Sequence, residues 1–426
     1  MPVETGAVSR YFDKRMINYI SSPLLVFFLL LSTLACQTRG TNEQTGSQQV
    51  AESKNLQEFK AFIKDLRSEF IYLDEKKVIV DCIEKTYSPY VDTISHPFYK
   101  VLFYEQLLNE LYDSHVHLNS NTDRSCRLNA PVYVEWRNDR FYIKNVFSSQ
   151  LDYQFDRNII GAEVLSFNGT IFQKAVDEFA THCHDKNDPE VREWLGNKVL
   201  AGKYHEPRVV ELKLPDGKEL TLDIDRLIQR QESSLLTASV SNNIGMIRIN
   251  NSLGNDGLVE AFDSVLNTMM DTRALILDLR NTPDGGITGV AEPMMGRFIS
   301  EERGYQLCES KTESYTSTVV PVGKTYPQPV FVLAGRWTGS MGEGMTIGLE
   351  GMQRATVIGT EMARLAGGMK TVPLINSNFG FRISFEKMRH IDGSLREEYV
   401  PDHYVDQKSL LKDEWVAEAV RLIGDN

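Results

Sequence analysis

Apolar residues recur every three or four positions in two stretches near the start of the chain's body. The first stretch runs from Leu56 to Leu73 and the second from Phe98 to Leu111. This spacing places the apolar side chains on one face of a helix. The pattern predicts an N-terminal helical region over about 56–128.

The pattern changes to short β-rich segments between 129 and 226. Pro215-Asp216-Gly217 has the composition of a hairpin turn. The phrase I-G-A-E-V-L-S-F-N-G-T at 160–170 resembles a strand pair of PDZ domains, in which Asn168-Gly169 would form the tight turn. We therefore expect a PDZ-like β module over 129–226. An unrelated small β domain is the alternative, because the carboxylate-binding G-L-G-F loop is not found.

After 240, apolar strands alternate with amphipathic helices. The strands read I-G-M-I-R-I-N, A-L-I-L-D-L, P-V-F-V-L-A-G and A-T-V-I-G, and helices are expected around 257–270, over 288–299 and from 340. Such alternation is typical of an α/β layer with parallel strands. The fold class expected for the chain is multidomain α+β, with an α/β core over 227–426.

The first residues have the layout of an export signal. Arg10, Lys14 and Arg15 precede the apolar run 23–35, which ends at Cys36. We predict a lipoprotein signal peptide over 1–36, a lipid on Cys36 and a polar tether over 37–55. The protein would be exported to a bacterial cell envelope. A plain secretory signal is the alternative, and the start could be Met1 or Met16.

Composition limits the classes of partner. The 426 residues are 42% hydrophobic and 24% charged, as in soluble globular proteins, and the formal net charge is −12. Nucleic-acid binding depends on clustered Lys and Arg, so no nucleic-acid partner is expected. We expect no cofactor and no membrane contact except through the lipid. The oligomeric state stays open, as does the disulfide pairing of Cys82, Cys126, Cys183 and Cys308 in an oxidising compartment.

Ser340 is the candidate nucleophile. It lies in W-T-G-S-M-G-E-G, where an apolar strand leads into a helix, and helix N-terminal amides favour negative charge. Taken alone, Ser340 and Glu343 also spell a helix capping box. An earlier strand runs into a turn with Gly285 and Gly286, and glycines let backbone N–H groups approach a substrate closely. That turn and the Met341 amide could form an oxyanion hole.

These segments together resemble the signature of tail-specific, or C-terminal processing, serine peptidases. The phrase D-L-R-N at 278–281, the Gly pair and S-x-x-E follow in the family's order over about 240–405, and Val400-Pro401-Asp402 resembles its closing segment. The resemblance implies a core of the crotonase/Clp-protease type and a polypeptide substrate. It also implies that Ser340 attacks the peptide carbonyl, while the amides of Gly285 or Gly286 and of Met341 hold the oxyanion.

The catalytic base departs from the Ser-Lys members of that family. The stretch that carries their lysine reads G-T-E-M-A-R-L-A-G-G at 359–368, with Leu365 in its place, and Lys370 lies beyond. Arg364 in this stretch cannot serve as the base, because an arginine does not give up its proton in proteins. Ser114-His115 resembles the pair of tricorn-type relatives, so His115 is the expected base, and His117 should point elsewhere. Glu397 or Glu398 would be the third member, and Glu398 is preferred. If their stretch is a strand, alternation lets only one of the two face the site.

Two other functions compete with peptidase activity. A chain without the lysine could be an inactive peptide-binding protein on the same scaffold, with His115 serving only to stabilise a helix C-terminus. A metal-dependent hydrolase would require the H-x-H pairs at 115–117 and 182–184 to converge, and we expect no metal because neither pair carries the acidic follow-up of a known metal motif.

Overall fold

The computed structural model describes residues 52–147, 158–227 and 232–425. Glu52–Asn426 forms one compact unit. The predicted signal peptide, the lipid site Cys36 and nearly all of the tether lie outside the described residues. Within the described residues, no helix combines the length and the apolar character needed to cross a membrane. The limits predicted for the individual domains stay a prediction.

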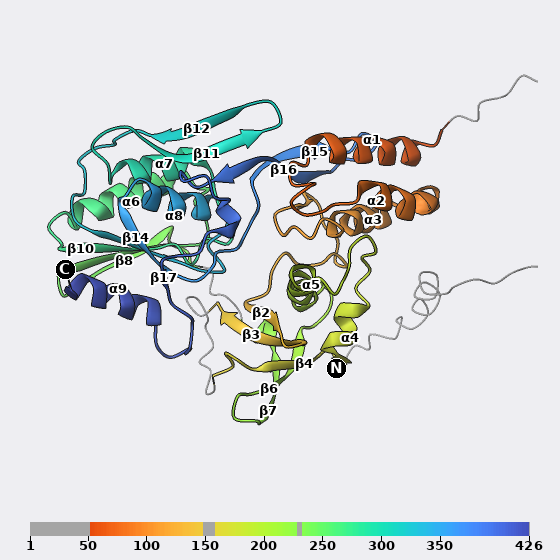
Figure 1. Ribbon diagram of the computed structural model, residues 1–426, viewed down its shortest axis with the longest axis horizontal. Coiled ribbons are helices and arrows are strands. Elements are labelled where there is room, and N and C mark those ends of the chain that lie inside the picture. The colour runs from red at the N-terminus through yellow and green to blue at the C-terminus, as the bar shows by residue number, and fades with distance from the viewer. Residues whose placement is uncertain (1–51, 148–157, 228–231, 426) are drawn as a thin grey trace, which may run out of the picture. The chain divides into compact units, whose positions relative to one another are not determined.

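A six-stranded sheet forms the centre of the C-terminal part, in the order β17-β14-β13-β10-β9-β8 (Figure 1). All neighbours are parallel except β8 and β9. The predicted alternation of parallel strands and helices is therefore confirmed. The strands are β8 (Leu236–Ser241), β9 (Ile244–Ile249), β10 (Ala274–Asp278), β13 (Val330–Ala334), β14 (Ala355–Gly359) and β17 (His403–Tyr404).

Helices cover both faces of this sheet (Figure 1). Leu275 and Leu277 of β10 point into a core shared with α6 (Gly257–Thr268), α7 (Thr288–Gly296) and α8 (Met341–Gly351). The alternate residues Ala274 and Ile276 pack instead against α9 (Glu414–Asp425). Every residue of β10 is buried, and the strand is apolar up to its last residue, Asp278, as is typical of parallel strands covered on both faces.

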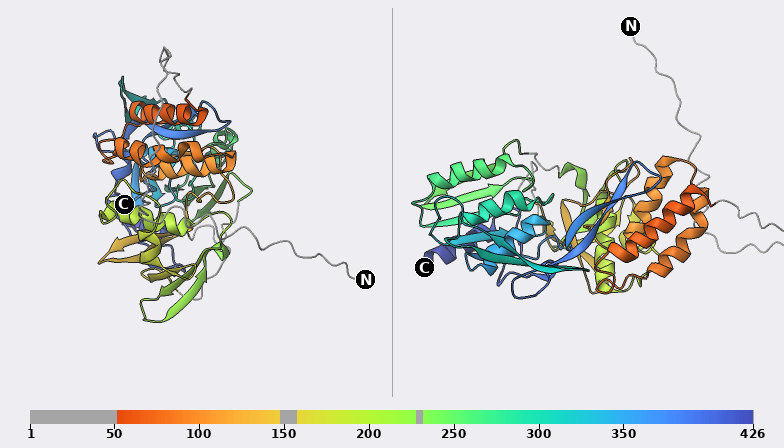
Figure 2. Two further views of the ribbon diagram at one scale, coloured as in Figure 1. Left: turned by 90° about the vertical axis from the view of Figure 1, so that its right-hand side faces the viewer. Right: turned by 90° about the horizontal axis from the view of Figure 1, so that it is seen from above.

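A second, antiparallel sheet joins the N-terminal helices to the C-terminal part. In its order β1-β16-β11-β12, with β15 also on β16, the strand β1 pairs with a strand near the end of the chain. Helix α1 lies against β16 (Figure 2), where the Phe62 and Phe381 rings are 4.9 Å apart. The elements are α1 (Lys54–Glu69), α2 (Val80–Tyr87), η2 (Ser88–Thr93), α3 (Pro97–Asn109), β1 (His117–Leu118), β11 (Arg303–Ser310), β12 (Ser314–Val319), β15 (Gly368–Pro373) and β16 (Gly380–Arg389).

A third sheet, also antiparallel, has the order β2-β3-β4-β6-β7, with β5 on β4. Both predicted turns are confirmed: Gly217 has φ +84° between β6 and β7, and Asn168-Gly169 joins β4 to β5 with positive φ at both residues. The PDZ-like character of this part stays a prediction. Its elements are β2 (Val132–Arg137), β3 (Arg140–Val146), β4 (Glu163–Phe167), β5 (Thr170–Ile171), α4 (Phe172–Asp177), α5 (Pro189–Ala201), β6 (Val209–Lys213), β7 (Glu219–Asp223) and η4 (Ile224–Arg226).

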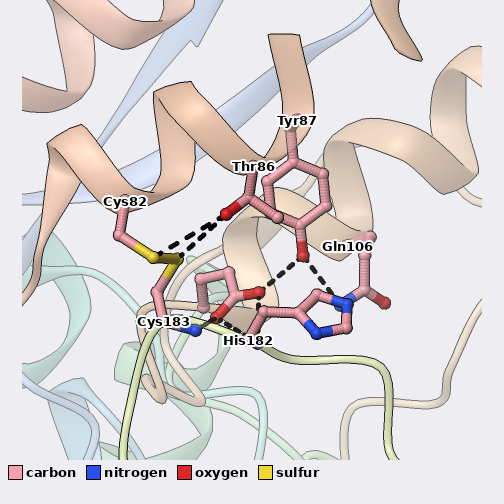
Figure 3. The surroundings of a disulfide bond; sticks show 7 residues. Cys82, Thr86, Tyr87, Gln106, His182 and Cys183 are labelled. Carbon is pink, nitrogen blue, oxygen red and sulfur yellow. Dashed lines mark hydrogen bonds between the residues drawn. A yellow bond between two sulfur atoms is a disulfide. The ribbon is translucent and has the colours of Figure 1, made fainter. Parts of the chain in front are cut away.

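One disulfide joins α2 to the segment between α4 and α5. Cys82 and Cys183 are 101 positions apart in sequence, and their Cα atoms are 5.7 Å apart (Figure 3). The buried Glu110 carboxylate beside it accepts hydrogen bonds from the Cys183 amide at 3.0 Å and from the Tyr87 hydroxyl at 2.5 Å. Cys126 and Cys308 are free.

Candidate active site

Ser340 lies at the sharp turn between β13 and α8. Its backbone has φ 48° and ψ −108°, a conformation that costs a non-glycine residue about 1–3 kcal/mol. Thr338 stabilises the turn, because its hydroxyl donates to the Leu279 carbonyl at 3.0 Å and accepts the Gly335 N–H at 3.0 Å. Ser340 is half-buried while the residues just before it are buried. The fold thus holds one strained serine at a helix N-terminus.

The Glu343 carboxylate ties this turn to a second loop. It is fully buried and accepts the Ser340 N–H at 2.8 Å, the Arg364 N–H at 2.9 Å and the Leu365 N–H at 3.2 Å. Burial raises the pKa of Glu343 to about 8, although Arg396 and the Ser340 and Leu365 amides act in the opposite direction. Glu343 therefore fixes the loop 363–367 against the nucleophile turn.

The Gly285–Gly286 turn lies directly against Ser340. A β-carbon at Gly285, which has φ +65°, would be 2.5 Å from the Ser340 Cβ, so only glycine fits there. The Gly285 N–H already donates to the Thr282 carbonyl at 3.0 Å. Among the described residues, the N–H groups of Gly286 and Met341 have no hydrogen-bond acceptor. Of the two glycines, Gly286 is therefore the one with a free amide.

His115 lies in a loop, six residues beyond the end of α3 at Asn109 and not at a helix C-terminus. Its backbone N–H donates to Asp113 Oδ1 at 2.8 Å, and its ring Nδ1 is 3.0 Å from the Ala366 carbonyl oxygen. A carbonyl can only accept, so Nδ1 carries the proton and Nε2 is left as an acceptor. Burial lowers the pKa of His115 to about 3, an effect that Arg396 and Arg382 increase.

A pocket of about 540 Å³ brings these groups together. Ser340, Gly286 and His115 all line it. In the described structure, the Ser340 hydroxyl and the His115 ring do not form a hydrogen bond with each other. Catalytic hydrogen bonds are often long in ligand-free structures and tighten when substrate binds. The pocket walls also include Ser114, His117, Leu128, Ala130, Tyr133, Trp194, Lys198, Ser252, Asp284, Ile287, Arg336, Trp337, Leu365 and Arg382.

Comparison with known families shows which enzyme family the region around Ser340 matches. The profile of Peptidase family S41 matches residues 243–405, nearly the stretch expected from the sequence. The chain therefore contains a region of peptidase family S41. It is a serine-type peptidase by class. The match contains Ser340, both glycines and the loop 363–367, whereas His115 lies outside it. A search of curated protein sequences finds no match to the chain.

Solved structures similar to this S41 peptidase confirm its mixed α/β fold. Mature CPAF complexed with lactacystin has a TM-score of 0.60 at 14% identity, over 88% of this chain and 99% of CPAF. A putative peptidase from Parabacteroides merdae ATCC 43184 has 0.52 at 16% identity, over 87% and 97%. The photosystem II D1 C-terminal processing protease has 0.52 at 13% identity, over 84% and 94%.

The lysine that could have served as base is engaged elsewhere in the peptidase. Lys370 lies on β15, as expected, and forms an ion pair with Glu69 of α1. It does not line the pocket, whereas Leu365 does, and a β-carbon on Gly339 would be 3.2 Å from Leu365 Cδ1. The apolar side chain of Leu365 therefore lies beside the nucleophile turn, at the position that the sequence resemblance assigns to the lysine of Ser-Lys members.

The two candidates for the third acidic member, Glu397 and Glu398, differ in their surroundings. Residues 396–398 form the short 3₁₀ helix η5 (Arg396–Glu398) and not a strand, so strand alternation does not select the inward residue. Glu398 is exposed, while Glu397 is half-buried beside Tyr72 and Asp113, and burial raises its pKa. Neither described carboxylate hydrogen-bonds His115. The partner of Nδ1 is the Ala366 carbonyl.

Other predicted and unpredicted residues complete the site. Ser114 is exposed at the rim, and His117 lines the pocket and does not point elsewhere as expected. Sequence reasoning missed the Ala366 carbonyl, which no side-chain pattern reveals, and treated Glu343 only as a cap. Among the described residues, no three His, Cys, Asp or Glu side chains are grouped so that they could hold a metal ion.

The buried His115 ring should make the fold acid-sensitive. The unfolded chain binds a proton on this ring below pH 6.5, but the folded chain binds it only near pH 3, so the free energy of unfolding should fall as the pH falls through this window. His115→Asn keeps a donor for Ala366 without titrating. Urea unfolding of both proteins at pH 7.5 and pH 4.5 should show a larger acid loss for the native chain. Equal losses would contradict the burial of a neutral ring.

Proposed function

We propose that this chain is an exported endopeptidase that cuts polypeptide tails or unfolded segments, with Ser340 as nucleophile and His115 as general base. In this assignment the Gly286 and Met341 amides bind the oxyanion, and the family variant is the tricorn-type, His-dependent one. The Ala366 carbonyl takes the orienting role that we expected of Glu398.

The proposed reaction follows the logic of nucleophile and base. His115 Nε2 accepts the Ser340 hydroxyl proton as the Ser340 oxygen bonds to the peptide carbonyl carbon. The negative oxygen that forms accepts hydrogen bonds from Gly286 and Met341, both beside the helix N-terminus. The His115 imidazolium then protonates the leaving amine as the C–N bond breaks. Water, deprotonated by the same ring, hydrolyses the ester and restores Ser340.

One observation carries this proposal above all: Ser340 and His115 line the same pocket, and the His115 nitrogen that does not bind Ala366 is free to accept a proton. The strain at Ser340 supports it further, because strained backbone clusters at functional sites. The ion pair of Lys370 with Glu69 supports the histidine over the lysine.

We also propose the location and the supporting modules. An N-terminal lipid on Cys36 would hold the peptidase in the cell envelope, and the Cys82–Cys183 disulfide supports an oxidising compartment. The part over 129–226 would act as a PDZ-like module that binds substrate tails, and the core over 227–426 would be of the crotonase/Clp-protease type.

A serine-directed covalent probe tests the function. The native chain should hydrolyse a denatured protein, and a fluorophosphonate should inactivate it by forming one adduct, which mass spectrometry should locate on Ser340. Heat-denatured chain, which lacks the pocket, is the control and should not react. An adduct on Ser114 or Ser252, which also line the pocket, would contradict the assignment. Tight peptide binding without hydrolysis or labelling would favour the inactive binding protein.

A further inference from the structure

The active-site pocket carries more positive than negative charge on its walls. Lys198, Arg336 and Arg382 line it, whereas Asp284 is the one carboxylate among the described lining residues. Arg336 is already compensated, since it lies 3.5 Å from the Glu361 carboxylate and over the Tyr133 ring. Two cations therefore remain for a ligand. This contrasts with the formal net charge of −12 on the whole chain.

Among the described residues, neither Lys198 nor Arg382 forms an ion pair with a carboxylate. Arg382 stands directly opposite His117 in the β1–β16 pair, so the two side chains are cross-strand neighbours. Lys198 comes from α5, where its ammonium lies 5.8 Å from the Trp194 ring centre. Both cations lower the pKa of His117, in addition to the effect of burial, which places them near the same ring.

A second pocket continues from this point. It has a volume of about 230 Å³ and shares His117, Leu128 and Lys198 with the active-site pocket. The two pockets therefore adjoin at His117, and the second lies beside α3. Lys198 stands where the two pockets meet, so a substrate residue at the junction would face it.

We propose that Lys198 and Arg382 form a subsite that binds a carboxylate of the polypeptide substrate, on the His117 side of the bond that Ser340 cuts. This inference rests on the proposed function and names the substrate feature that the site selects. The carboxylate is either an acidic side chain or the C-terminal carboxylate of the substrate, and both present the same chemistry to the two cations.

Binding of such a carboxylate would also assist the base. Burial is the main reason that His115 has a low pKa, and the charge of Arg382 adds to it. A bound carboxylate beside Arg382 offsets that positive charge, so the His115 ring accepts the Ser340 proton more readily when an acidic substrate is in place.

Four matched peptides with a quenched fluorophore test the subsite on the full-length protein. They carry Asp or Asn at the junction position, each with a free or an amidated C-terminus. The favoured carboxylate should raise kcat/KM by about tenfold over its neutral counterpart, as one partly buried charge pair does. Preference for Asp identifies a side chain, and preference for the free terminus identifies a chain end.

Variants connect the preference to the two cations. Lys198→Met and Arg382→Met should each abolish the preference, so that the favoured peptide and its neutral counterpart are cleaved at equal rates. Lys174→Met, on the exposed surface of α4, is the matched control and should change neither rate. Equal cleavage of all four peptides by the native chain would overturn the subsite. An equal loss for charged and neutral peptides in the variants would do the same.

Binding measured without cleavage separates this inference from the proposed function. Fluorescence anisotropy with the Ser340→Ala variant should show the same carboxylate preference, and Lys198→Met in that background should remove it. If the native chain cuts nothing but the preference is present, the subsite stands and the catalytic proposal fails. If the chain cuts peptides but binds all four equally, the subsite fails alone.

Discussion

Ser340→Ala and His115→Ala should each lower kcat on a denatured protein by about 10⁴-fold or more, and the double variant should be no slower than the worse single variant. The reason is that the two side chains act as one unit: without the base the hydroxyl is a weak nucleophile, and without the hydroxyl the base has no proton to accept. Initial rates of the three variants, with far-ultraviolet circular dichroism to confirm folding, measure this.

Lys370→Met is the matched control for that experiment. It removes the ion pair with Glu69 outside the pocket, so it should keep kcat within a few-fold of the native value, since partly exposed ion pairs contribute about 0–1 kcal/mol. If Lys370→Met were inactive while His115→Ala stayed active, the base would be the lysine and the loop 363–367 would have to move on substrate binding.

Removal of the disulfide should lower the free energy of unfolding by about 4 kcal/mol. Cys82 and Cys183 close a loop with a sequence separation of 101, and a cross-link over that length restricts the unfolded chain strongly in the chain-entropy description. Urea unfolding of the Cys82→Ser/Cys183→Ser double variant, compared with the native chain, measures the loss. Packing around the bond should survive, because the Glu110 hydrogen bonds involve backbone and hydroxyl groups.

A reductant provides an independent check on the same bond. Dithiothreitol should lower the urea midpoint of the native chain and leave the double variant unchanged. Cys126→Ser, which removes a free cysteine, should respond to the reductant as the native chain does. A native chain with the same midpoint under reducing and oxidising conditions would show that the bond is absent or contributes no stability.

The central sheet and the nucleophile turn could be predicted because their signals are local. A run such as 274–279, apolar except for Asp278 and bounded by polar residues, predicts a buried strand, and S-x-x-E after the next apolar run predicts a helix start. The structure confirms both at β10 and α8. The glycine pair and Ser340 at its spacing after that pair also allowed the family to be predicted. Both motifs lie within the region that the family profile matches.

Other parts of the site could not be predicted, because their causes are not side-chain patterns. The acceptor for His115 is a main-chain carbonyl, which every residue has, so Ala366 carries no signal in the sequence. The choice between Glu397 and Glu398 depended on whether their stretch was a strand, and it is a 3₁₀ helix. The pairing of Cys82 with Cys183 depends on tertiary contacts that four cysteines alone do not specify.

The placement of His115 outside the S41 match has a consequence for how the protein can be divided. In the proposed mechanism the family region carries nucleophile and oxyanion hole but no base, so residues 243–405 alone would not cut peptides. A nick between 184 and 339 would leave the two halves without a covalent link, because Cys82 and Cys183 both belong to the N-terminal half. Such a split enzyme would depend on non-covalent contacts, among them the pairing of β1 with β16 and the packing of Phe62 against Phe381, to keep its halves together.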